Sequence, residues 1–515
     1  MFLPDYLIMK LKFLLSIALA LTPIFTFSQS DILLNASNSI KIDDLKKMLY
    51  IYSSDEFGGR GTPSKGQDLA INFLEERYRK MGVKSLQKDT YLQPVKLQFD
   101  FKPKVSLSIN GQIFEYYKDF ISYNNGPKVN FNDEEIIFVG YGIDDPKYSD
   151  YSNINVKGKV VLAFNGEPKN EDGGFFINGD QKSNWSNNRE ELNNKREAAK
   201  KNGAKSLILL NDYLYNRYRY EYEYSDSGMG EKRMSLEDDS NNGPHVFLFP
   251  TKFKNSFNEK KLKLNLNFEP KYEKFTAYNV AAYIEGSDYP DEYIVITAHL
   301  DHVGIQNGEI YNGADDDGSG TIGILEIAEA FAIAKKQGYK PKRSIIFLHV
   351  TAEERGLLGS KYYVDYDPLV PLEQTITCLN IDMIGRTDPN RGIRNMNYIY
   401  IIGSDILSDD LHEINKIANE KYVNLELDYR YNDPTFPVFE SGRTIENQYY
   451  YRSDHYHFVK NNIPSIFFFS GTHVDYHQPT DTAEKILYEL YEKRVKLIFH
   501  TAWDLANNET RIQLK

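Results

Sequence analysis

The sequence predicts an α/β fold in which a mostly parallel β-sheet is covered by helices on both faces. Short, continuously apolar segments such as 293–298 and 344–350 have the length and composition of strands that are buried on both faces. Amphipathic stretches of helical length, such as 317–336, alternate with these segments. Between residues 106 and 272 the pattern changes to short alternating strands and frequent turns, which predicts an inserted, β-rich α+β domain.

Composition limits the class of protein. The 515 residues include 61 Lys and Arg against 73 Asp and Glu, a net charge of −12 with neutral histidines, and 41% are hydrophobic. This is a globular composition with room for more than one domain, and the acidity argues against a general nucleic-acid binder, because phosphate binding needs an excess of Lys and Arg. The single cysteine, Cys378, excludes an internal disulfide framework and a Cys-rich zinc module. Any metal site must therefore use His, Asp and Glu.

Residues 1–30 have the pattern of a secretory signal peptide. Two lysines precede the apolar run 13–27, and small polar residues follow it. The run is short for a membrane span, and Pro23 interrupts it. We therefore expect an exported protein, periplasmic or secreted, whose mature chain has no membrane span. Whether the chain starts at Met1 or Met9 stays open.

The elements before and within the insert follow from local patterns. Residues 31–105 should form a helical part of the main domain, with apolar residues at helical spacing over 41–53 and 64–81. Ser64 with Gln67 three positions later resembles a capping box. For the insert, the patterns predict a helix at 189–201 and strands at 104–109, 135–139, 160–164 and 206–210.

The stretch 211–245 is rich in Tyr, Asp, Ser and Arg and has little apolar periodicity, which predicts a long exposed loop. Regular α/β structure then fills residues 273–515. Beyond the segments named above, further strands fit 375–381, 398–402 and 463–469, and further helices fit 356–364, 407–420 and 483–506. In such folds the functional site lies outside the carboxyl ends of the strands.

His, Asp or Glu residues stand in five loops at this side of the expected sheet. The loops are 299–302, 313–320, 351–354, 382–385 and 470–482. Taken singly, each such residue is more often a helix cap, a solvated charge or a satisfied hydrogen-bonding group. Five loops of this kind together are not explained in that way, so the sequence predicts one shared site.

Two histidines and three carboxylates without cysteine suit zinc, with other divalent ions possible. Two divalent ions supply a charge of +4, which three carboxylates and one hydroxide neutralise. Such a pair polarises a carbonyl and activates water near neutral pH. The proton acceptor should be Glu353 or Glu354, because neighbouring residues of an extended chain project to opposite sides.

These motifs resemble those of peptidase family M28, co-catalytic zinc peptidases whose best-known members are secreted bacterial aminopeptidases. The matching segments follow in family order: His299-x-Asp301, Gly313-Ala314-Asp315-Asp316-Asp317-Gly318-Ser319-Gly320, Thr351-Ala352-Glu353-Glu354, Asn380-Ile381-Asp382-Met383 and Asp475-Tyr476-His477-x-Pro479-x-Asp481-Thr482. The resemblance implies a zinc aminopeptidase-like fold, with 273–515 as the catalytic domain and 31–105 as its helical N-terminal part.

The resemblance also implies two Zn²⁺ per chain and a role for each matching residue. Asp316 would bridge both ions, and the full ligand set would be His299, Asp316, Glu354, Asp382 and His477. Glu353 would be the general base and then the acid that protonates the leaving amine. The Asp301 carboxylate would hold the second ring nitrogen of His299. Tyr476 would stabilise the tetrahedral oxyanion, although a buried core tyrosine fits equally well.

Several nearby residues have weaker assignments. His302 is expected to be a loop residue, and His473 is a rival of His477 that does not match the motif spacing. The segment 453–455 resembles one that lines the substrate pocket. Within the insert, the matching stretches 138–142, 156–161, 195–205 and 207–210 resemble a protease-associated (PA) domain, which would act as a lid or a substrate-access element.

The leading interpretation is an aminopeptidase acting on peptides or proteins. A carboxypeptidase of the same family, similar to glutamate carboxypeptidase, stays open because Arg386, Arg443 and Arg452 lie in loops near the site. A glutaminyl cyclase is less favoured because those relatives lack the insert. A non-catalytic binding ectodomain is disfavoured because every ligand position is filled, and a serine hydrolase because no Gly-x-Ser-x-Gly is present. The preferred terminal residue and the oligomeric state stay open.

Overall fold

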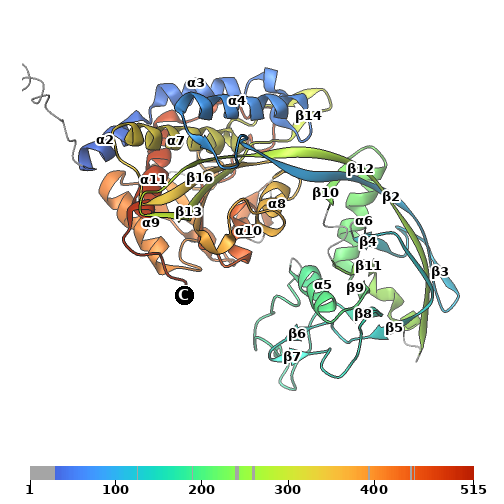
Figure 1. Cartoon of the computed structure of the whole chain (residues 1–515). Helices are drawn as coiled ribbons and strands as arrows, with labels where there is room; N and C mark the ends of the chain where they lie inside the picture. Colours follow the sequence, from blue (N-terminus) through green and yellow to red (C-terminus); the bar gives the residue numbers. More distant parts are fainter. Residues whose placement is uncertain are drawn as a thin grey trace, which may run out of the picture.

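The computed structural model describes residues 29–515, except 124–125, 188–189, 238–242, 258–260, 392–394, 441–442 and 446. The expected signal peptide therefore lies outside the described residues, apart from Gln29 and Ser30, which begin helix α2. Figure 1 shows a helix-covered part that two long strands connect to the insert. Within the described ranges, no helix combines the length and apolar character that crossing a membrane requires.

The sheet of the helix-covered part has the strand order β19-β18-β22-β17-β13-β16-β12. Its strands are β12 Leu262–Ile284, β13 Tyr289–His299, β16 Arg343–Val350, β17 Thr375–Ile381, β18 Tyr398–Ile402, β19 Glu426–Asp428 and β22 Ser465–Phe469. Strand β13 pairs in parallel with β16 and β17, and β17 pairs in parallel with β22, whereas β12 and β18 run antiparallel to their neighbours β16 and β22. The expected mostly parallel sheet is confirmed.

Helices cover both faces of this sheet, as its continuously buried strands require (Figure 1). The helices are α2 Gln29–Ser39, α3 Ile42–Tyr52, α4 Lys65–Met81, α7 Gly320–Lys336, α8 Leu358–Asp365, α9 Asp409–Tyr422, α10 His455–Lys460 and α11 Tyr488–Asn507. On one face, α3, α4, α7 and α11 bury Leu49, Leu74, Phe331 and Trp503 in one core. On the other face, Tyr363 of α8 and Phe458 of α10 pack against the sheet.

The insert is built on two long strands. Strand β2 (Leu92–Ile109) pairs antiparallel with β12 along its length, and the sheet then continues through β5, β8, β9, β11 and β4. The other elements here are β3 Gln112–Phe114, β4 Ile121–Tyr123, β5 Val129–Phe138, β8 Val160–Phe164, α5 Glu191–Lys201, β9 Ser206–Leu210, α6 Asp212–Asp226, β10 Arg233–Leu236 and β11 His245–Phe249. The expected boundaries near residues 105 and 272 fall inside β2 and β12, so the division into domains stays a prediction.

The remaining strands are short. They are β1 Lys84–Ser85 and the hairpins β6 Asp144–Asp145 with β7 Tyr148–Ser149, β14 Gly304–Gln306 with β15 Glu309–Tyr311, and β20 Val438–Glu440 with β21 Arg443–Ile445.

The long loop expected at 211–245 is wrong, because its first half is helix α6. The Asn211 side chain caps this helix by accepting a hydrogen bond from the backbone N–H of Leu214 at 3.0 Å. Leu214, Tyr218 and Tyr222 then place one face of the helix against the core of the insert. Most of this face is tyrosine, which has an apolar ring and a polar tip, and a pattern of purely apolar residues does not detect it.

Arg60 holds the main chain around the carboxyl end of β13. Its side chain is fully buried and donates to the carbonyl oxygens of Asn312 and Gly313, at 2.6 and 2.7 Å, and to those of Leu300 and Tyr52, both at 3.2 Å. These carbonyls belong to separate segments that the sheet does not pair. The Leu300 carbonyl also accepts from the Tyr52 hydroxyl and the Gly313 carbonyl from the Gly318 N–H, so Arg60 matters most for the carbonyls of Asn312 and Tyr52.

We expect Arg60→Met to lower the free energy of unfolding by at least about 3 kcal/mol, because each buried acceptor left without a partner costs about 1–3 kcal/mol. Denaturant unfolding followed by Trp503 fluorescence in a Trp185→Phe background measures the change. The control is Arg79→Met, which removes an exposed pair with Glu75 and should cost less than about 1 kcal/mol. Equal losses in the two variants would contradict the role of Arg60.

Candidate metal centre

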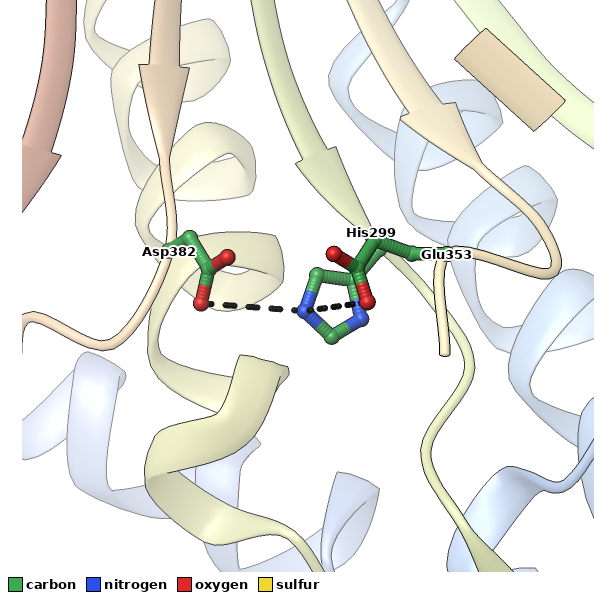
Figure 2. A group of neighbouring side chains, drawn as sticks. All are labelled: His299, Glu353 and Asp382. Atoms are coloured by element: carbon green, nitrogen blue, oxygen red, sulfur yellow. Dashed lines mark ion pairs between the residues drawn. The ribbon is translucent and has the colours of Figure 1, made fainter. Parts of the chain in front are cut away.

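Three neighbouring strands bring the first group of side chains together. His299 is the last residue of β13, Asp382 directly follows β17, and Glu353 lies in the loop after β16. Because these strands are parallel neighbours, their carboxyl ends meet at one edge of the sheet, and Figure 2 shows the three side chains converging there. The His299 Nε2 atom lies 3.7 Å from Asp382 Oδ1 and 3.9 Å from Glu353 Oε2.

Asp316 joins this group to a second one. Its Oδ1 atom lies 3.2 Å from His299 Nε2, and its Oδ2 atom lies 3.0 Å from His477 Nε2. His477 Nε2 is in turn 3.2 Å from Glu354 Oε2. The two oxygens of one carboxylate thus face two different histidines, which is the arrangement needed to share a carboxylate between two cations.

The backbone around Asp316 is held by its neighbours. Asp481 Oδ2 accepts hydrogen bonds from the backbone N–H groups of Asp315 and Asp316, at 3.0 and 3.1 Å. Asp317 Oδ1 accepts from the N–H groups of Gly320 and Met383, at 2.8 and 3.1 Å. In the run of three aspartates, the middle side chain faces the histidines, while Asp317 caps helix α7.

His302, expected to be a loop residue, lies in the cluster. Its Nδ1 atom is 2.8 Å from Glu354 Oε1 and 3.7 Å from Asp316 Oδ2, and the residue is buried. The contact with Glu354 is an ion pair by distance, while neither ring nitrogen forms a hydrogen bond of regular geometry within the described residues. The spacing from His299 was the only sequence signal available, because periodicity does not show where a loop side chain points.

The structure contradicts the expected contact of the Asp301 carboxylate. The Nδ1 atom of His299 lies 3.0 Å from the backbone oxygen of Asp301, which fixes the ring in place of the carboxylate. The carboxylate is turned away because its Oδ1 atom accepts the backbone N–H of Glu353 at 3.1 Å. Asp301 therefore connects the loops after β13 and β16.

Two further expectations are settled by contacts. His473 Nε2 lies 3.2 Å from Asp315 Oδ2, so His473 partners a buried carboxylate outside the cluster. In the segment 453–455, Ser453 donates to Asp382 Oδ2 at 2.7 Å, behind the cluster rather than along the pocket. The residue before this segment, Arg452, lines the pocket instead.

The cluster opens into a small pocket of about 40 Å³ whose other walls are mainly apolar. The additional lining residues are Met383, Tyr449, Arg452, Phe467, Phe469, Thr472 and Tyr476. The Tyr476 hydroxyl oxygen accepts a hydrogen bond from Arg452 Nη2 at 3.2 Å, and the Tyr476 ring stacks on His477 with centroids 3.9 Å apart. Of the other arginines expected nearby, Arg386 pairs with Asp475 at 3.0 Å. The Arg443 residue lies in β21, and its side chain is not described.

The histidines of the cluster keep the carboxylates of Asp316 and Glu354 ionised by lowering their pKa values. Burial and the Asp316 carboxylate act to raise the pKa of Glu354, but His477 and His302 outweigh them and lower it to about 2. Burial opposes ionisation of Asp316 as well, yet His302, His299 and His477 hold its pKa well below the usual range. These carboxylates are therefore charged at neutral pH.

Glu353 differs from its neighbour Glu354. Burial raises the pKa of Glu353 well above its usual range, and the carboxylates of Asp454 and Glu354 add to the increase while His299 opposes it. A carboxyl group that readily holds a proton is suited to general acid–base chemistry.

The residues present fit zinc. Two groups of side chains could each hold a metal ion, because one atom from every member lies within 4.8 Å of the others. The groups are His299 with Glu353 and Asp382, and His302 with Asp316 and Glu354. Neither ring nitrogen of His302, nor Asp316 Oδ2 or Glu354 Oε1, forms a hydrogen bond of regular geometry among the described residues, although all are buried. Imidazole and carboxylate donors at this spacing are those that bind Zn²⁺.

The part of the chain that carries the site is similar to known proteins. Residues 279–502 match the model of peptidase family M28. A probable leucine aminopeptidase 2 from Aspergillus oryzae is 32% identical over 214 residues, which are 41% of this chain and 37% of that one. A probable glutamate carboxypeptidase from Arabidopsis thaliana is 36% identical over 104 residues, 20% of this chain and 14% of that one. The matches thus span less than two fifths of these relatives.

Among solved structures, an aminopeptidase from Aneurinibacillus sp. strain AM-1 aligns with a TM-score of 0.46 and 17% identity, over 93% of this chain and 96% of that one. A zinc aminopeptidase from Bacillus subtilis aligns with a TM-score of 0.44 and 19% identity, over 92% and 98% of the two chains.

The segment 279–502, which matches peptidase family M28, contains all five expected metal ligands.

Proposed function

We propose that this protein is an exported zinc aminopeptidase that releases N-terminal residues from peptides. The observation that carries the proposal is the position of Asp316, whose two oxygens face His299 and His477. The names of the curated relatives, mostly leucine aminopeptidases, support cleavage from the amino end. Export rests on the sequence of residues 1–30.

The proposed ligand sets combine the contacts with the positions of the family motif. By distance alone both His302 and His477 could bind beside Asp316 and Glu354, and the motif position favours His477. One ion would bind His299, Asp382 and Asp316, and the other would bind Asp316, Glu354 and His477, so that Asp316 is shared. His302 would orient Glu354 through its Oε1 atom, a contact of the kind that usually fixes a ligand. When bound, the zinc ions would polarise the scissile carbonyl and lower the pKa of the attacking water.

The protein groups around the zinc ions would move protons and stabilise charge. Glu353 would take the proton of the attacking water and pass it to the leaving amine, as its raised pKa allows. The Tyr476 hydroxyl accepts a hydrogen bond from Arg452, so its own proton remains available for the oxygen that becomes negative during attack. Arg452 would thereby position Tyr476 and keep a positive charge near that oxygen.

The position of Arg452 also favours the alternative function, a carboxypeptidase, because a guanidinium beside the metal centre could bind the free carboxylate of a substrate. One tetrapeptide, either acetylated at its N-terminus or amidated at its C-terminus, separates the two functions. An aminopeptidase cleaves only the amidated form, because acetylation removes the free amine. We expect that result, with loss of cleavage in a zinc chelator. Cleavage of only the acetylated form would show a carboxypeptidase.

Glu353→Gln should lower kcat by at least about a hundredfold, the scale of general acid–base catalysis, and leave the zinc content unchanged. The amide keeps the shape of the side chain but accepts no proton. Steady-state kinetics together with metal analysis of the same preparation measure both effects. Normal turnover would show that the base is assigned wrongly.

Asp316→Ala should lose both zinc ions as well as activity, because the substitution removes a ligand from each. Metal analysis after dialysis gives the stoichiometry. The control is Asp43→Ala on the exposed surface of α3, which should keep its full metal content. A fully loaded Asp316→Ala protein would rule out the bridging role.

A further inference from the structure

A large cleft lies between the insert and the segment that carries Glu354. Its volume is about 690 Å³, within the range of sites that bind small ligands. Residues of helix α6 and strand β10 of the insert line one side, and residues of the loop after β16 and the start of α8 line the other. The tyrosine-rich sequence that was expected to be a loop thus forms a wall of this cleft.

The cleft lies beside the metal centre, because Glu354 lines both this cleft and the small pocket that holds the other expected ligands. The metal centre therefore has a small pocket and, beside it, a wide cleft. An enzyme that removes one terminal residue needs limited room on one side of the scissile bond and an open path on the other. The cleft is the larger of the two spaces, so we assign to it the longer part of the peptide, beyond the residue held at the metal centre.

The cleft is more basic than the protein as a whole. Its lining has five cations against four carboxylates, namely Arg196, Lys232, Arg233, Arg355 and Lys361 against Asp100, Glu221, Glu231 and Glu354. Two of the cations are ion-paired, Arg233 with Asp226 at 3.4 Å and Arg355 with Glu231. Burial raises the pKa of Glu221, which weakens its negative charge. This positive lining is unusual in a chain with a net charge of −12. It would attract negative groups of a substrate.

Aromatic rings add a contact surface on the same wall. The Tyr220 and Tyr224 side chains are 69% and 44% exposed, although both rings are large. They are stacked with centroids 6.1 Å apart and an angle of 3° between their planes. Exposed tyrosines present rigid amphipathic surface at low entropic cost, which suits contact with a passing peptide chain.

Polar contacts fix the two walls relative to each other. Glu231 of the insert forms an ion pair with Arg355, the residue after Glu354, and accepts a hydrogen bond from Gln306 at 3.0 Å. The insert is thus attached to the loop that carries a predicted metal ligand.

We propose that this cleft binds the part of the substrate on the carboxyl side of the scissile bond and selects peptides with acidic residues there. The inference rests on the proposed aminopeptidase function. The positive lining selects the charge, and the tyrosine pair contacts the chain. The cleft makes the insert a determinant of specificity rather than a source of metal ligands.

The test compares kcat/KM for Leu-Gly-Gly-Glu-Glu and Leu-Gly-Gly-Lys-Lys. For the wild type at low salt we expect the acidic peptide to be favoured by about fivefold or more, and the ratio to approach one in about 0.5 M NaCl. The double variant Lys232→Glu/Lys361→Glu changes one cation on each wall and should abolish or reverse the preference. Both rates come from one preparation, so partial misfolding cancels in the ratio.

The matched control is Lys47→Glu, an exposed change on α3 outside the cleft, which should keep the wild-type ratio. A wild-type ratio near one at low salt, or an unchanged ratio in the double variant, would overturn the inference. Leucine p-nitroanilide distinguishes a failure of the cleft proposal from a failure of the aminopeptidase proposal. Its leaving group contains no amino acid residues, so its hydrolysis does not depend on residues bound in the cleft. If the anilide is hydrolysed but the two peptides have equal kcat/KM, only the selectivity of the cleft is rejected. If no substrate is hydrolysed, the aminopeptidase proposal is rejected.

Discussion

The contact on which the site depends is the placement of one carboxylate between two histidines. The oxygens of Asp316 lie 3.2 Å from His299 and 3.0 Å from His477, although these residues come from distant parts of the chain. Such a placement requires a rigid backbone. Asp481 supplies it by holding two consecutive N–H groups, and Arg60 by holding the carbonyls just before the aspartate run.

The second feature that shapes the molecule is the pair of long strands β2 and β12. Because both strands belong to the sheet of the helix-covered part and to that of the insert, they connect the two without a separate linker. The contact between Glu231 and Arg355 adds a second connection beside the metal centre. The assignment of the insert as a PA domain stays a prediction. The residues of the insert that line the cleft are the same whether or not it is a PA domain.

The sequence was sufficient to predict the sheet and most of the residues that meet at its edge. Strands such as β18 and β22 are buried along their whole length, and their almost wholly apolar and aromatic sequences are easily recognised. Residues directly at a strand end, such as His299 and Asp382, are then placed by the strand itself.

The features that the sequence did not predict are in segments whose structure the spacing of apolar residues does not indicate. His302 and the Asp301 carboxylate stand in a loop, and the direction of each is set by hydrogen bonds and packing from other loops. Helix α6 was missed because its buried face is mostly tyrosine. The insert boundaries stay a prediction, because β2 and β12 pass from one part to the other without a break in their pattern.

The central claim is that Asp316 is shared between two metal ions. Anomalous diffraction at the zinc edge, from crystals of the zinc-loaded protein, tests it most directly. The account predicts two peaks about 3.5–4 Å apart, one beside each carboxylate oxygen of Asp316. A single peak, or two peaks of which only one contacts Asp316, would contradict it.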